Sequence, residues 1–118
     1  MNIAIIDDSS FSRRQLRRVL LEAFPQAVFI EFSSGNEAIE KLPQAKVDLI
    51  TLDLVMPPPG GMEVLEELRS KGVATPIFIV SADIQESTQH RCFELGCSGF
   101  LEKPLTASKL HVLKDALA

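Results

Sequence analysis

The segment VDLITLDLVMP, residues 47–57, constrains the fold more than any other part of the chain. Its apolar residues are β-compatible and almost uninterrupted, which is typical of a strand buried on both faces of a parallel sheet. Asp53 lies where this run ends, and the prolines from Pro57 onward prevent a strand or helix from continuing directly. Open α/β sheets place their functional groups at the carboxyl ends of such strands. The segment therefore predicts a functional carboxylate, Asp53, at the edge of a parallel sheet.

Apolar strand-like segments alternate with amphipathic helical segments along all 118 residues. The predicted strands are residues 2–6, 27–32, 47–54, 76–80 and 99–101, and the predicted helices are about residues 10–23, 35–42, 60–71, 84–95 and 106–117. Ser9 or Ser10 is expected to cap the first helix, and Gly72 to follow the end of the third. Right-handed crossovers would place helices on both faces of one parallel sheet. The sequence predicts an α/β fold in a single domain, residues 1–118.

Charge and composition exclude several other classes of protein. The net charge of −4 argues against a general nucleic-acid-binding surface, and the four arginines between positions 13 and 18 are expected on a solvated helix face. The sequence shows neither a secretion signal nor a membrane-spanning segment, which predicts a cytoplasmic protein. Cys92 and Cys97 are too few for a disulfide framework or a zinc site. We expect Cys92 in the core and Cys97 in a loop.

Polar residues follow four of the five predicted strands. They are Asp7 and Asp8 after the first strand, Asp53 after the third, Ser81 after the fourth and Lys103 after the fifth. Carboxylates meeting at one edge repel, by about 1–4 kcal/mol per pair near a protein surface, so a cation is expected among them. Mg²⁺ fits this expectation, with carboxylates, a backbone carbonyl near Val55 and a phosphate oxygen as ligands.

The same residues suit the formation of an acyl phosphate. Asp53 supplies a carboxylate nucleophile, Lys103 a charge that balances a phosphoryl group, and Ser81 a hydroxyl donor. Each also has an ordinary structural interpretation: the first acidic pair or Ser81 can cap a helix, Asp53 can be a turn residue, and Lys103 can simply be solvated. Their joint occurrence at matching strand ends favours the functional interpretation.

These motifs resemble the receiver domain of bacterial two-component response regulators over the whole chain. IIDDS resembles the acidic pair of that family, LDLVMPPPGG its phospho-acceptor segment, VSA its hydroxyl site, and GFLEKP its aromatic residue and its lysine before proline. The resemblance implies a flavodoxin-like, doubly wound, five-stranded parallel sheet with strand order 2-1-3-4-5. DDSSFSRR resembles the regulators of chemotaxis.

The resemblance also implies a role for each acid. Asp53 accepts a phosphoryl group from a histidine kinase or a small donor. Asp8, Asp53 and the Val55 carbonyl bind Mg²⁺, and Asp7 acts mainly through a metal-bound water. Apart from catalysing its own phosphorylation and dephosphorylation, the domain is not expected to be an enzyme.

A switch is implied by the same resemblance. Ser81 and Lys103 hold the phosphoryl oxygens, and Phe100 turns inward when Ser81 shifts toward the phosphate. This changes the surface formed by the fourth helix, the fifth strand and the fifth helix. The Lys103–Pro104 bond is implied to be cis.

The partners implied are a histidine kinase and a downstream protein target or a fused output domain. A dimer through the switching surface is one assembly that the resemblance allows. We expect neither direct nucleic-acid binding nor membrane binding by this domain.

The chain departs from the family pattern at a few positions. Gly60 stands where an acid is frequent, prolines 57–59 stiffen the loop, Phe100 replaces the common tyrosine, and Ser81 replaces the commoner threonine. Two alternative functions are left open. A haloacid-dehalogenase-type phosphatase needs a second aspartate two residues after the nucleophile, where this chain has Val55. An interaction module that is not phosphorylated is the other.

Overall fold

The computed structural model describes residues 1–117, in which strands and helices alternate. The strands are β1 (Asn2–Ile6), β2 (Val28–Phe32), β3 (Leu49–Leu52), β4 (Ile77–Ser81) and β5 (Gly99–Glu102). The helices are α1 (Ser10–Ala23), α2 (Gly35–Lys41), α3 (Gly61–Ser70), α4 (Glu86–Glu94) and α5 (Leu110–Leu117), with short 3₁₀ helices at Leu42–Gln44 and Ala107–Lys109. All strand pairs are parallel, in the order β2-β1-β3-β4-β5. The predicted α/β class and the strand order are confirmed.

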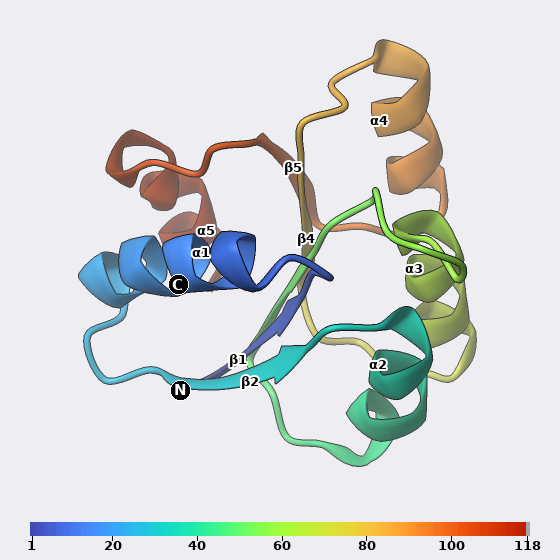
Figure 1. The fold of residues 1–118 in the computed structure, drawn as a ribbon, viewed down its shortest axis with the longest axis horizontal. Coiled ribbons are helices and arrows are strands. Elements are labelled where there is room, and N and C mark those ends of the chain that lie inside the picture. The colour runs from blue at the N-terminus through green and yellow to red at the C-terminus, as the bar shows by residue number, and fades with distance from the viewer. Residues whose placement is uncertain (118) are drawn as a thin grey trace.

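Helices cover both faces of the sheet, as Figure 1 shows. Helices α1 and α5 lie on one face, and α2, α3 and α4 lie on the other. Because every crossover joins parallel strands, the carboxyl ends of all five strands lie along one edge. The loops that follow the strands therefore meet at that edge.

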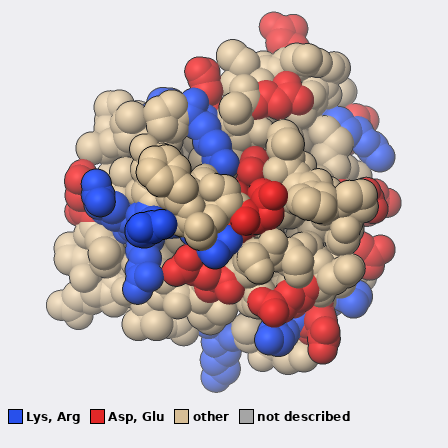
Figure 2. Space-filling view, viewed as in Figure 1, with Lys and Arg blue, Asp and Glu red and all other residues tan. Residues whose placement is uncertain are grey.

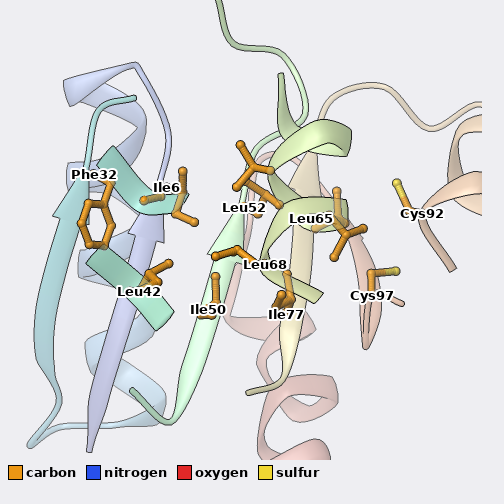
Figure 3. Close-up of a cluster of buried hydrophobic side chains, with 14 residues drawn as sticks. Ile6, Phe32, Leu42, Ile50, Leu52, Leu65, Leu68, Ile77, Cys92 and Cys97 are labelled. Carbon is orange, nitrogen blue, oxygen red and sulfur yellow. The ribbon is translucent and has the colours of Figure 1, made fainter. Parts of the chain in front are cut away.

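Each face of the sheet buries its own apolar cluster. In β1, Ala4 and Ile6 pack with α2, α3 and α4, whereas Ile3 and Ile5 pack with α1 and α5. Figure 3 shows part of the first cluster, in which Cys92 and Cys97 are buried at its margin. Strands β3 and β4 are likewise buried throughout. This two-sided burial explains the nearly continuous apolar runs in the sequence.

The ends of several elements differ from the prediction. Strand β3 is shorter than the predicted 47–54 because β1 pairs only with Leu49–Leu52. The fourth helix begins at Glu86 rather than at 84, and Ile84 is exposed in the loop before it. The first turn of the predicted last helix is a 3₁₀ helix. The apolar pattern located these elements correctly, but hydrogen bonding determines where they end.

The first helix begins with a side-chain cap, as expected. The Ser9 hydroxyl accepts a hydrogen bond from the backbone N–H of Ser12 at 3.1 Å. Gly72 follows the end of α3 with a φ of +84°, a conformation that glycine adopts without steric cost.

The loop between β3 and α3 packs closely against the end of β3. A Cβ atom on Gly61 would lie 2.6 Å from the Cα of Leu54 and would also overlap the backbone carbonyl of Asp53. Only glycine lets α3 begin this close to the strand end. The Pro58–Pro59 bond in this loop is cis, which the sequence had not indicated. Within residues 1–117, every helix is too short or too polar to cross a lipid bilayer.

Candidate functional site

Backbone hydrogen bonds between neighbouring strands place the predicted residues at one edge of the sheet. The backbone N–H of Asp53 donates to the carbonyl of Ile6 at 3.0 Å, and that of Lys103 donates to the carbonyl of Ser81 at 2.9 Å. Asp7 and Asp53 directly follow the paired residues Ile6 and Leu52 of adjacent strands. The strand ends therefore bring these side chains together, as the alternation of strands and helices predicted.

Three carboxylates gather at this edge. Asp7, Asp8 and Asp53 each offer an oxygen, and these oxygens all lie within 4.8 Å of one another. Asp7 is 1% exposed and Asp53 is 8% exposed, whereas Asp8 is open to solvent. On the face of the molecule in Figure 2, acidic side chains gather near the centre and basic side chains lie directly beside them. A cluster of hard oxygen donors with one exposed member is suited to a divalent cation such as Mg²⁺.

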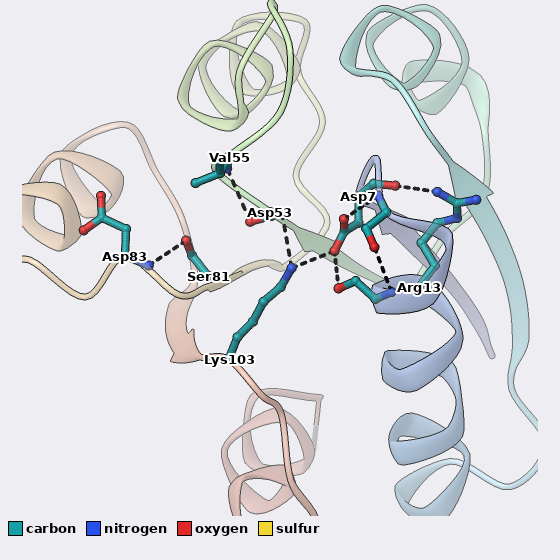
Figure 4. A network of polar contacts seen from close by, with 9 residues as sticks. Asp7, Arg13, Asp53, Val55, Ser81, Asp83 and Lys103 are labelled. Atoms are coloured by element: carbon teal, nitrogen blue, oxygen red, sulfur yellow. Dashed lines mark hydrogen bonds and ion pairs between the residues drawn. The ribbon is translucent and has the colours of Figure 1, made fainter.

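The Lys103 ammonium forms ion pairs with both buried acids, Asp7 and Asp53. Its Nζ atom lies 2.9 Å from Oδ2 of Asp7 and 3.2 Å from Oδ2 of Asp53, as Figure 4 shows. Partial burial acts to lower the pKa of the Lys103 ammonium, but the two carboxylates outweigh it, and the pKa lies above its usual value. Lys103 is therefore positively charged at neutral pH and offsets part of the repulsion between the acids.

Asp53 is held from two sides. Its Oδ1 accepts a hydrogen bond from the backbone N–H of Val55 at 3.3 Å, and its Oδ2 accepts the one from Lys103. Burial raises the pKa of the Asp53 carboxyl, and the charge of Asp7 raises it further, while Lys103 opposes the shift. The carboxylate is less well solvated than an ordinary surface aspartate.

Asp7 receives more support than the sequence indicated. Its Oδ1 accepts from the backbone N–H of Ser9 at 3.0 Å, and its Oδ2 accepts from the Ser12 hydroxyl at 2.6 Å. The Arg13 guanidinium donates to the Asp7 carbonyl at 2.7 Å and pairs with Glu31 at 3.0 Å. The prediction that Arg13 lies on a solvated face was wrong, because its side chain folds back over the end of β1 and is only 17% exposed.

Ser81 is fully buried, and a hydrogen bond to its side chain joins it to the following loop. Its hydroxyl accepts from the backbone N–H of Asp83 at 3.2 Å (Figure 4). Asp83 in turn accepts from the backbone N–H of Gln85 and from the Thr88 hydroxyl, each at 3.2 Å. Ser81 does not cap α4. Asp83 instead ties the loop to the first turn of that helix.

The remaining predicted residues surround this centre. Phe100 is half-buried and packs against the cluster beneath α2, α3 and α4. Val55 is 68% exposed. The Lys103–Pro104 bond is cis. A pocket of about 320 Å³ lies beside Lys103, between α1 and the segments after β4 and β5. It is lined by Ser12, Gln15, Leu16, Ala82, Lys103, Pro104 and Leu105.

Comparison with known proteins identifies the family. The family model described as the response regulator receiver domain matches residues 3–114. The chain belongs to this family. The receiver domain is 37% identical to the transcriptional regulatory protein ResD of Bacillus subtilis over 115 residues, which are 98% of this chain and 47% of ResD. It is 28% identical to the chemotaxis protein CheY of Listeria monocytogenes over 117 residues, which are 98% of both chains.

Solved structures agree with this assignment. A chain in the crystal structure of the CheX-CheY-BeF₃-Mg complex from Borrelia burgdorferi matches with a TM-score of 0.90 and 26% identity, covering 100% of this chain and 90% of that chain. The receiver domain spans less than half the length of ResD and of the protein-glutamate methylesterases that it also matches. It spans nearly all of the CheY proteins.

Sequence reasoning missed the residues that support the receiver domain's acids. Ser12 and Arg13 lie five and six residues after Asp7, and Asp83 lies two residues after Ser81. The only signal in the sequence was that polar side chains occupy the first turn of α1 and the loop before α4. Which of them turn toward the site depends on the path of each loop, and apolar periodicity does not report that path.

Proposed function

We propose that this receiver domain works in two-component signalling by accepting a phosphoryl group on Asp53. The observation that carries the proposal is the position of Asp53: its carboxylate lies at a strand end, 3.2 Å from the Lys103 ammonium and within reach of two further carboxylates. The comparisons support the proposal because the chain belongs to the response regulator receiver family.

The proposed donor is a phosphorylated histidine of a kinase or a small phosphoryl compound. An Asp53 oxygen attacks phosphorus, and the bond from phosphorus to the donor nitrogen or oxygen breaks. The electron pair of that bond stays on the donor, and Asp53 becomes an acyl phosphate. A departing histidine nitrogen takes a proton from solvent, whereas a carboxylate such as acetate leaves as the anion. Lys103 already carries the positive charge that the phosphoryl oxygens require, so the site stabilises the transition state mainly by charge and position.

The residues present fit Mg²⁺. The clustered side-chain donors are all carboxylate oxygens, and an exposed Asp8 beside a buried Asp53 leaves room for water, which Mg²⁺ retains. We propose Asp8, Asp53 and the backbone carbonyl of Val55 as direct ligands, with Asp7 acting mainly through water. Bound Mg²⁺ supplies positive charge that offsets the acids and the phosphoryl group.

The proposed response to phosphorylation begins at Ser81. Its hydroxyl donates to a phosphoryl oxygen, and Phe100 turns inward as the loop after β4 shifts. Because Asp83 connects this loop to α4, the movement reaches the surface of α4, β5 and α5. Phe93 on this surface is half exposed, which supports a role in binding a protein target.

We propose that residues 1–118 form one receiver domain that is phosphorylated by a histidine kinase and acts on a downstream protein or a fused output domain. A dimer through α4, β5 and α5 is the assembly proposed for the phosphorylated form. We propose no catalysis beyond the phosphorylation and dephosphorylation of Asp53. A phosphatase of the haloacid-dehalogenase type is not favoured, because Val55 occupies the position of its acid/base residue.

The experiment is intact-mass analysis after incubation with Mg²⁺ and acetyl phosphate. We expect one added phosphoryl group that is removed at alkaline pH, and no such adduct on Asp53→Asn. Asp48→Asn, an exposed acid before β3, is the matched control and should still be phosphorylated. The same adduct on Asp53→Asn would exclude Asp53 as the acceptor.

A further inference from the structure

The Ser12 hydroxyl makes the shortest of the three hydrogen bonds to the Asp7 carboxylate. It donates to Oδ2 at 2.6 Å, compared with 2.9 Å for Lys103 on the same oxygen and 3.0 Å for the Ser9 N–H on Oδ1. Ser12 is not needed to cap α1, because the Ser9 side chain already does so. The hydroxyl of Ser12 is therefore directed at the acid cluster for a reason other than starting the helix.

The hydrogen bond from Ser12 limits which oxygen of Asp7 can meet a cation. A carboxylate accepts about four hydrogen bonds or metal contacts, two on each oxygen. Ser12 and Lys103 together occupy Oδ2, and Ser9 takes one position on Oδ1. Oδ1 thus keeps the one free position of Asp7. Rotation of the carboxylate would break these contacts and leave a 1%-exposed charge without its partners, which is costly.

Phosphoryl transfer is expected to draw Lys103 away from Oδ2. In the proposed function, its ammonium turns from the two acids toward the phosphoryl group on Asp53. When it does, Ser12 is the donor that remains on Oδ2 of Asp7. Both Ser12 and Lys103 line the pocket of about 320 Å³, so the Lys103 side chain has space in which to move.

We propose that Ser12 is a positioning residue for phosphoryl transfer: its hydroxyl keeps Oδ2 of Asp7 occupied, so that Oδ1 alone faces the cation and its water. This inference rests on the proposed function. It adds that the orientation of Asp7, and not only its charge, contributes to metal binding, and that the orientation is set by the first turn of α1.

The test compares Ser12→Ala with Ser12→Thr, which keeps the hydroxyl, and with Ser10→Ala, an exposed serine on the same turn. Calorimetric titration with Mg²⁺ is expected to show roughly tenfold weaker binding by Ser12→Ala, the loss expected for one hydrogen bond to a charged group. Ser12→Thr and Ser10→Ala should bind as the parent does. With acetyl phosphate, Ser12→Ala should need correspondingly more Mg²⁺ for half-maximal rate, while its KM for the donor stays unchanged.

A metal-free crystal structure of Ser12→Ala separates this inference from the proposed function. We expect the Asp7 carboxylate to be rotated or to adopt two orientations in that variant. Unchanged Mg²⁺ affinity together with an unrotated Asp7 would overturn the role of Ser12. A parent protein that binds no Mg²⁺ and accepts no phosphoryl group would overturn the proposed function, and the orientation of Asp7 in the variant would then still decide whether Ser12 holds it.

Discussion

The Ser81 hydroxyl accepts a hydrogen bond from the backbone N–H of Asp83 at 3.2 Å. The Asp83 side chain then reaches the first turn of α4 through the Thr88 hydroxyl, also at 3.2 Å. The buried Ser81 hydroxyl at the end of β4 is thus connected to the first turn of α4 by two hydrogen bonds through Asp83.

Replacing Thr88 with valine should loosen the start of α4. The variant removes a donor to Asp83, and we expect about 0.5–1.5 kcal/mol lower stability to urea, the usual contribution of one hydrogen bond. Amide exchange at residues 85–89 should also become faster than in the parent. Ser87→Ala, an exposed change on the same turn, serves as the control. Equal exchange rates in Thr88→Val and the parent would show that the hydrogen bond from Thr88 to Asp83 does not hold the start of α4.

The charge of Asp53 should destabilise the metal-free fold at neutral pH. Burial raises the pKa of this carboxyl in the folded state, so the folded chain binds the proton more tightly than the unfolded chain does. Stability attributable to Asp53 therefore falls as the pH rises from the unfolded pKa through the folded pKa. Asp53→Asn should melt a few degrees higher than the parent at pH 7 without metal.

That difference between Asp53→Asn and the parent should shrink as the pH is lowered through the carboxyl range. Melting curves at a series of pH values measure it. A parent that melts at or above the temperature of Asp53→Asn at pH 7 would contradict the raised pKa. Glu66→Gln, which changes an exposed acid of α3 outside the cluster, controls for a simple change in net charge.

Mg²⁺ should raise the melting temperature because it binds the folded acid cluster. A ligand at 100 times its dissociation constant stabilises the fold by about 2.7 kcal/mol. Asp8→Ala removes the exposed acid of the cluster, so most of this increase should be lost. Thermal melts with and without Mg²⁺ provide the measurement, and Ca²⁺ tests the preference for the smaller ion. If Asp8→Ala responded to Mg²⁺ as fully as the parent, Asp8 would not be a ligand.

Replacing Thr51 with valine in the core should not destabilise the fold. Its hydroxyl is buried in β3 and has no hydrogen-bond partner among residues 1–117. Thr51→Val replaces it with a methyl group of similar shape, so we expect unchanged or higher stability, by up to about 1–2 kcal/mol. Chemical denaturation measures the difference, and Thr75→Val, whose hydroxyl has a partner at 3.4 Å, provides the contrast. A clear loss of stability in Thr51→Val would mean that the hydroxyl is satisfied after all.

The sequence predicted the framework because the framework depends on local patterns. Buried strands and amphipathic helices alternate, so the positions of Asp7, Asp53 and Lys103 at one edge follow from apolar periodicity and from the handedness of the crossovers. The five parallel strands agree with this reasoning, and their order is the one that the family resemblance implied.

Apolar periodicity and crossover handedness do not predict the contacts that loops and long side chains make. Arg13 has the spacing of a solvated residue but folds back onto Asp7, and Ser12 turns toward the acids rather than to solvent. The cis bond between Pro58 and Pro59 was likewise not predicted from the sequence. These features depend on how a loop closes in three dimensions, and the residue types involved are common in many other settings.

Gly61 limits how this domain can change by mutation. Because a Cβ atom there would overlap the backbone of Asp53, any other residue requires the end of β3 or the start of α3 to move. The placement of the Asp53 carboxylate is therefore tied to the packing of a helix whose other residues lie outside the acid cluster. In a library that randomises position 61, we expect accepted substitutions to be rare and to occur together with compensating changes in residues 54–60.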